Sequence, residues 1–174
     1  MPYIYETHMH TNQASACGRS PGRDYIRPYM DAGYAGIIIT DHFYRGNCAV
    51  DRSLPWKEFI RRFCAGYEDA RNEGEKLGFP VFFGWEENVD GDEYLIYGLD
   101  GDWMAERPDM PTWTRRQMHD FVRAAGGCVV QAHPSGRGTI TTISICPRKC
   151  ATAWRSTTPA TSGTGTSSPR GTPP

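Results

Sequence analysis

Short apolar runs alternate with longer amphipathic stretches along the first 134 residues of the chain. Continuous runs such as Ile37-Ile38-Ile39 and Val129-Val130 are typical of strands that are covered on both faces of a sheet. From this pattern we expect five strands, at Tyr3–Glu6, Gly36–Thr40, Val81–Gly84, Tyr94–Gly98 and Cys128–Ala132.

Two stretches between these strands have helical periodicity. From Trp56 to Ala70 the apolar side chains recur every three or four residues on one face, and Gly78 marks the end of the helix. A second pattern runs from Met118 to Ala125, and Thr114 and Gln117 have capping-box spacing at its start. These stretches therefore predict two amphipathic helices that pack on the sheet.

The stretch around Ile26 is less regular, because Pro28 would cost about 3 kcal/mol in the interior of a helix. We expect a helix there that is short or that begins at Pro28. The resulting order, β-α-β-α-β-β-α-β, predicts a largely parallel α/β sheet or barrel. A complete barrel of this kind needs about 250 residues, so five strands in the first 134 residues form part of one.

The composition changes beyond Pro134. Thr, Ser, Pro and Gly supply 26 of the 40 residues in 135–174, and such segments bury too little apolar surface to become ordered. We therefore expect a domain over residues 1–134 and a disordered tail over residues 135–174. The tail is either a natural linker or coding sequence that is read out of frame.

The net charge of −1 is an average over two unlike parts. Residues 1–120 hold all 20 acidic residues and 13 of the 19 Lys and Arg, whereas residues 121–174 hold six basic residues and no carboxylate. The six positive charges of residues 121–174 are sparse, and Trp154 is the one aromatic residue after Phe121. This composition does not favour nucleic-acid binding. No apolar run approaches the ~18 residues of a membrane span and no signal peptide opens the chain, so we expect a cytoplasmic protein without membrane contact.

Histidines and a carboxylate lie at the ends of four predicted strands. His8 and His10 follow the first strand, His42 the second, Glu86 the third and His133 the last. Because the carboxyl ends of parallel strands meet at one edge of a sheet, these side chains are expected to converge. The sequence therefore predicts a metal site with these five ligands.

Each element has a structural alternative. The His8-x-His10 pair could face solvent, Asp41-His42 could be a turn or a helix cap, and Glu86-Glu87 could be a solvated acidic pair. His133 could simply end a strand. If there were no metal site, all of these alternatives would have to hold independently, although the four elements share the same position at a strand end. Taken together, the elements therefore favour the metal site.

The remaining histidine and two cysteines are expected to have other roles. His119 lies within a helical pattern, which favours packing or a surface position. Cys17 and Cys48 lie in loops after the first two strands, where a thiolate could bind zinc, although small partly buried residues are the simpler interpretation.

The chemistry of the predicted ligands favours two or three divalent transition metals. Imidazoles with a carboxylate suit Zn²⁺, Mn²⁺ or Fe²⁺, and such ions activate bound water and neutralise phosphate oxygens. Asp41 is the expected catalytic residue, because it could orient an imidazole from behind. Arg19 and Arg45, in the neighbouring loops, could meet an anionic substrate.

In four motifs the sequence resembles the PHP family (polymerase and histidinol phosphatase). The motifs are Glu6-Thr7-His8-Met9-His10-Thr11, Ile39-Thr40-Asp41-His42, Gly84-Trp85-Glu86 and Gln131-Ala132-His133-Pro134. The resemblance implies a distorted, TIM-like barrel of seven strands, incomplete here, with a two- or three-metal site that cleaves phosphoesters. The implied partner is a small phosphorylated substrate or a nucleotide, and Glu86 is the implied bridging carboxylate.

Two departures from the family pattern affect the expected activity. Many members have another histidine near the fourth strand, where this chain has Tyr94 and Tyr97, and the family's last motif, Asp-x-His, is absent. We therefore expect a phosphoesterase whose activity is impaired in this chain. The alternative is a non-catalytic domain that keeps a structural metal site.

Overall fold

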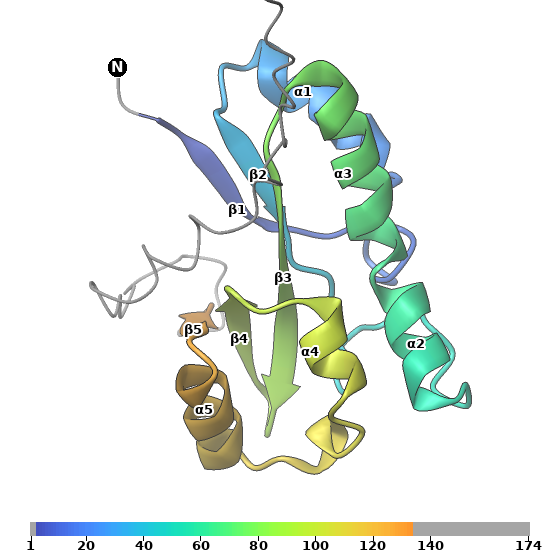
Figure 1. Ribbon diagram of the computed structural model, residues 1–174, viewed down its shortest axis with the longest axis vertical. Helices are drawn as coiled ribbons and strands as arrows, with labels where there is room; N and C mark the ends of the chain where they lie inside the picture. The colour runs from blue at the N-terminus through green and yellow to red at the C-terminus, as the bar shows by residue number, and fades with distance from the viewer. Residues whose placement is uncertain (1–2, 134–174) are drawn as a thin grey trace, which may run out of the picture.

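The computed structural model describes residues 3–133, which form a curled five-stranded sheet with helices packed against it (Figure 1). The expected boundary at Pro134 and the expected tail lie outside the described residues. The strands are β1 (Tyr5–Met9), β2 (Gly36–Ile39), β3 (Val81–Val89), β4 (Asp92–Tyr97) and β5 (Cys128–Ala132). The helices are α1 (Ile26–Asp31), α2 (Trp56–Phe63), α3 (Ala65–Leu77), α4 (Gly101–Ala105) and α5 (Arg115–Ala124), with 3₁₀ turns η1 (Gly22–Tyr25) and η2 (Met110–Thr112).

The sheet is mixed rather than parallel throughout. Its strand order is β1-β2-β3-β4-β5; β1, β2 and β3 are parallel, whereas β4 is antiparallel to both of its neighbours. The reversal occurs at Asp90-Gly91, where both residues have positive φ, 56° and 86°. Such a pair forms the tight turn that joins antiparallel strands. The mixed α/β class is confirmed, and only β4 departs from the expected direction.

Three strands extend further toward the predicted site than the sequence indicated, and one of them is β4, which begins at Asp92 rather than at Tyr94. β1 ends at Met9 rather than at Glu6, and β3 continues to Val89 because its second half pairs with β4. His8 and Glu86 consequently lie inside strands instead of following them.

The helices begin and end largely as the sequence predicted. The long pattern after Pro55 is divided into α2 and α3 at Cys64, and Gly78 ends α3 in the left-handed conformation. The capping box of Thr114 and Gln117 is present at the start of α5. Pro28 is the third residue of α1, where its missing N–H removes no intrahelical bond. Among residues 3–133, no helix is long and apolar enough to cross a membrane.

The two faces of the sheet have different neighbours. Trp85 and Ile96 point toward the helices and join the main core with Phe43, whose ring touches those of several aromatic neighbours. On the opposite face Leu95, Val130 and Ala132 form a small apolar cluster. This second face is concave: the Tyr97 hydroxyl on β4 donates to the Thr7 carbonyl on β1 at 2.8 Å, although two strands lie between them.

Candidate metal centre

The five predicted ligands meet on the concave face. Glu86 is fully buried, and its Oε2 lies 3.1 Å from His8 Nε2, 3.2 Å from His10 Nε2 and 3.2 Å from His42 Nδ1. His133 Nε2 is 4.0 Å from the other oxygen, Oε1. The rings of His10 and His42 stack at 4.3 Å with an interplanar angle of 6°. One carboxylate is thus surrounded by four imidazoles from three separate parts of the chain.

The backbone beyond β2 explains how these side chains come together. After β2 ends, the ladder with β3 continues: Glu86 N donates to the Asp41 carbonyl at 3.0 Å, and Phe43 N donates to the Glu86 carbonyl at 2.8 Å. This pairing sets His42 directly beside Glu86. The Phe43 ring, packed in the core on the other side of the sheet, anchors the segment.

The surroundings of the cluster favour a neutral His10 ring beside an ionised Glu86 carboxylate. Burial and the neighbouring His42 lower the pKa of His10 to about 4, so the His10 ring is neutral at pH 7. Burial alone would raise the pKa of Glu86, but the hydrogen bond from His8 and the nearby imidazoles lower it overall. An ionised carboxylate among imidazoles with available lone pairs is a set of atoms that suits a divalent cation.

Several buried polar atoms of the cluster have no hydrogen-bond partner within the described residues. They are His42 Nδ1, Glu86 Oε1 and His133 Nδ1. Buried polar atoms without a partner are uncommon in folded proteins, because each costs about 1–3 kcal/mol. Their concentration here fits a site that binds a cation.

Three overlapping groups of donor atoms, each within 4.8 Å of one another, could hold an ion. They are His8, Glu86 and His133; His42, Glu86 and Glu93; and His10, Cys17 and His42. Glu93 and Cys17 are additions to the ligand set predicted from the sequence.

Neither addition has a strong signal in the sequence. Glu93 stood in an acidic stretch that resembles solvated surface, and only its pairing with Ala132 shows that it lies on the concave face. Cys17 stood near the site, but a thiol in a loop is not specific. In the structure Cys17 is exposed beside the imidazoles, whereas Cys48 is buried and burial raises the pKa of its thiol.

Asp41 lies behind the cluster, and its oxygens are engaged by hydroxyl and amide groups. Oδ1 accepts hydrogen bonds from Thr11 N at 2.6 Å and Ser15 Oγ at 2.7 Å, and Oδ2 accepts one from Thr11 Oγ1 at 2.7 Å. Burial raises the pKa of Asp41 to about 6 although these bonds oppose the shift. The sequence predicts that Asp41 orients an imidazole directly. In the structure Asp41 is connected to an imidazole through Ser15, whose Oγ is 3.5 Å from His10 Nδ1.

The neighbouring charged residues belong to the helix side of the sheet. Glu87 alternates with Glu86 and points into the core, where burial raises its pKa to about 7. Arg45 Nε is 3.1 Å from Glu87 Oε1, and Arg45 Nη1 donates to the Trp113 carbonyl at 2.8 Å. Arg45 therefore links the sheet to the segment before α5 instead of facing a substrate.

Two other residues singled out in the sequence lie outside the cluster. Arg19 is exposed. His119 packs edge-on against Tyr94, as its position in a helix predicted.

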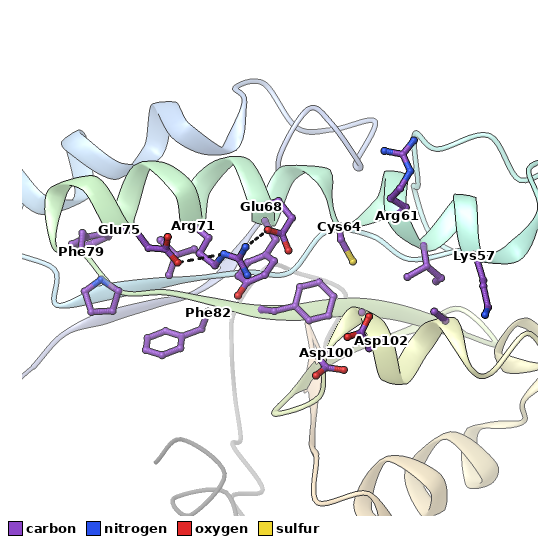
Figure 2. Close-up of a pocket in the computed structure, with 17 residues that line it drawn as sticks. Lys57, Arg61, Cys64, Glu68, Arg71, Glu75, Phe79, Phe82, Asp100 and Asp102 are labelled. Atoms are coloured by element: carbon purple, nitrogen blue, oxygen red, sulfur yellow. Dashed lines mark ion pairs between the residues drawn. The ribbon is translucent and has the colours of Figure 1, made fainter. Parts of the chain in front are cut away.

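A cavity of about 860 Å³ lies away from the histidines, between α2 and α3 on one side and β3 and α4 on the other. Figure 2 shows Arg71 between Glu68 and Glu75 on α3, with Asp100 and Asp102 across the groove. Burial raises the pKa of the Cys64 thiol in its wall to about 12, so this thiol is not a nucleophile at pH 7. The groups suited to reactive chemistry among the described residues are concentrated at the cluster of four histidines around Glu86.

No model of a known protein family and no curated protein sequence matches the chain. Two crystal structures are among the solved structures that share its fold. One is a candidate metal-dependent phosphoesterase from Bifidobacterium adolescentis, with a TM-score of 0.51 and 13% identity, over 87% of this chain and 74% of that one. The other is a two-domain protein from Bacteroides vulgatus that contains a predicted PHP-like metal-dependent phosphoesterase, with a TM-score of 0.54 and 15% identity. That match covers 86% of this chain but only 40% of the Bacteroides protein. The resemblance to the PHP family is thus confirmed at the level of the fold.

Proposed function

We propose that this chain is a PHP-type metal-dependent phosphoesterase that hydrolyses a phosphomonoester or a nucleotide or oligonucleotide phosphoester. The observation that carries the proposal is the convergence of four imidazoles on the buried carboxylate of Glu86. The fold shared with a candidate metal-dependent phosphoesterase and with a protein that contains a predicted one supports it independently.

Two or three divalent cations, Zn²⁺, Mn²⁺ or Fe²⁺, would be held by the predicted ligands His8, His10, His42, Glu86 and His133. Cys17 would supply a thiolate beside His10 and His42, and Glu93 a second carboxylate beside His42 and Glu86. Bound there, the cations would polarise the phosphoryl group and lower the pKa of water toward about 7. The mixture of nitrogen, oxygen and sulfur donors favours zinc over magnesium or calcium.

The protein's own groups keep the site in a form that accepts cations. The neutral His10 presents a lone pair at neutral pH, since the pKa of its ring is about 4. Glu86 supplies negative charge from a fully buried position, where the Phe43 amide and the Asp41 carbonyl fix its backbone. Asp41 supports the cluster from behind, and the substrate would approach from the concave side.

The five described strands correspond in this proposal to part of a seven-stranded barrel. The sequence contains no Asp-x-His, the motif that supplies two further ligands in the family. We therefore expect hydrolysis by this chain to be slow compared with that of a PHP protein that has the motif.

The test measures metal content and hydrolysis on the same purified protein. We expect two or more equivalents of transition metal by elemental analysis, and cleavage of p-nitrophenyl phosphate or bis-p-nitrophenyl phosphate in the presence of Mn²⁺ or Zn²⁺. His8→Ala should abolish this cleavage. The matched control is His119→Ala, which removes an imidazole that packs on Tyr94, outside the cluster, and should leave the rate unchanged. A wild-type chain that binds no transition metal, or a His8→Ala variant with the wild-type rate, would contradict the proposal.

A second candidate is a non-catalytic domain with a structural metal site. The concave face supports this candidate, because among residues 3–133 its apolar cluster has three buried residues, Leu95, Val130 and Ala132, while the histidine cluster joins separate strands. In that case a chelator would lower the thermal midpoint and no phosphoester would be cleaved under any metal. Chelation that stops hydrolysis in a protein that remains folded would favour the enzyme.

A further inference from the structure

The hydroxyl group of Ser15 lies at the centre of the contacts behind the histidine cluster, the four imidazoles around Glu86. Ser15 is 1% exposed, and its Oγ lies 2.7 Å from Asp41 Oδ1, 2.8 Å from the His42 amide nitrogen and 3.5 Å from His10 Nδ1. One small side chain therefore contacts the buried carboxylate and two of the residues that converge on Glu86.

The donors and acceptors around this hydroxyl determine where its single proton lies. Asp41 accepts hydrogen bonds from Thr11 N and Thr11 Oγ1 as well, so its oxygens act as acceptors throughout. Ser15 must then donate its proton to Asp41, and its remaining lone pairs are left to accept. The amide N–H of His42 occupies one of them.

The remaining lone pair of Ser15 Oγ faces His10 Nδ1, which must therefore carry a proton to make a favourable contact. A neutral imidazole has one N–H, so a proton on Nδ1 leaves a lone pair on Nε2. His10 Nε2 lies 3.2 Å from Glu86 Oε2, which is also an acceptor. Two facing acceptors repel each other unless a cation lies near both of them.

We propose that Ser15 is a positioning residue that holds His10 as the Nδ1–H tautomer and directs the Nε2 lone pair toward the cation site beside Glu86. Asp41 acts through Ser15 because its carboxylate fixes the direction of the Ser15 hydroxyl. The inference rests on the proposed metal centre and adds a device that sets the tautomer of one ligand.

The backbone holds Ser15 in this place independently of its side chain. Ser15 N donates to the Thr11 carbonyl at 3.0 Å, and Ser15 forms an isolated antiparallel bridge with Cys48. Removal of the hydroxyl should therefore leave the loop in position while releasing the His10 ring.

The direct test reads the His10 ring by ¹⁵N NMR in the wild-type protein loaded with Zn²⁺, where a cation lies between Nε2 and Glu86 Oε2. We expect the proton on Nδ1; a proton on Nε2 would overturn the inference, and this readout does not depend on hydrolysis. It therefore separates failure of the Ser15 inference from failure of the proposed function, which metal content and phosphoester cleavage decide.

The second test compares Ser15→Ala with Ser53→Ala. The Ser53 hydroxyl donates to Asp51 in the same way, at 2.9 Å, but on the exposed surface, which makes it a matched control. Loss of a group that orients a metal ligand weakens metal binding about 10–100-fold. We expect that loss of Zn²⁺ affinity for Ser15→Ala in chelator competition, a mixed His10 tautomer, and no change in either for Ser53→Ala. Ser15→Thr, which restores the hydroxyl, should restore the tautomer. An unchanged tautomer and affinity in Ser15→Ala would overturn the inference.

Discussion

Gly66 couples helix α3 to the residues behind the histidine cluster. It is buried near the start of α3, and a Cβ built on it would overlap the side chain of Thr11, whose hydroxyl donates to Asp41. We predict that Gly66→Ala destabilises the protein although alanine is the better helix former. The cause is the displacement of Thr11 from Asp41.

The expected magnitude follows from three opposing contributions. Replacement of glycine by alanine within a helix stabilises by about 1 kcal/mol. Overpacking against Thr11 costs about 1–3 kcal/mol, and weakening of a hydrogen bond to the buried Asp41 carboxylate costs about 1.5–3 kcal/mol. The net destabilisation should be about 1.5–5 kcal/mol, a large part of the roughly 5–15 kcal/mol typical of a domain.

Urea denaturation of the metal-free protein measures this difference directly, through the midpoint at constant m-value. The control is Asn72→Ala at an exposed position of the same helix, where alanine should stabilise by a few tenths of a kcal/mol, about the difference in propensity. The two substitutions should therefore have opposite signs. A Gly66→Ala variant that is as stable as the wild type would refute the role assigned to the contact between α3 and Thr11.

Three further predictions concern the charged and sulfur-containing groups. Arg45→Ala should destabilise by about 3–5 kcal/mol at pH 8, because it leaves the buried Glu87 carboxylate unpaired. Burial already raises the pKa of Glu87 to about 7, so the folded state favours the protonated carboxyl and loses stability as the pH rises from about 4.5 to 7. At pH 5 the carboxyl is protonated, and the destabilisation by Arg45→Ala should be smaller. Equal destabilisation at pH 5 and pH 8 would contradict this account. With Co²⁺ bound, the near-ultraviolet thiolate absorption band should be present in the wild type and in Cys48→Ser but absent in Cys17→Ser; a band that persists in Cys17→Ser excludes Cys17 as a ligand. Glu93→Gln should weaken the binding of one equivalent of cation about tenfold without lowering the thermal midpoint of the metal-free protein, as measured by calorimetry; unchanged cation binding would exclude Glu93.

The positions of the strands and of the converging side chains could be predicted because strong local signals specify them. Ile37-Ile38-Ile39 is apolar without interruption, as a strand covered on both faces must be, and His42 lies three residues after Ile39. The convergence of His8, His42, Glu86 and His133 then follows from the common direction of β1, β2, β3 and β5. A rule about strand ends was enough to place these side chains near one another.

The contacts behind the cluster could not be predicted in the same way. Ser15 and Thr11 are ordinary polar residues in a loop, and their relation to Asp41 depends on the path of the chain between β1 and α1. The division of the long helical pattern at Cys64 is also a tertiary effect, since the apolar spacing continues across it. Local propensity carries no information on either feature.

The direction of β4 determines which of its residues reaches the cluster. Alternation of apolar and polar residues predicts a strand at this position but reads the same in both directions. In the observed antiparallel pairing Glu93 lies opposite Asn88 on β3 and Ala132 on β5, the residue before His133, so its carboxylate comes within 3.9 Å of His42 Nδ1. A parallel β4 would instead bring its last residue, Tyr97, to that end of the sheet and carry Glu93 to the other. The expected role of Glu93 as a ligand therefore depends on the Asp90-Gly91 turn. A substitution that disfavours positive φ there, such as Gly91→Val, should weaken cation binding at Glu93 before it affects the binding that depends on His8.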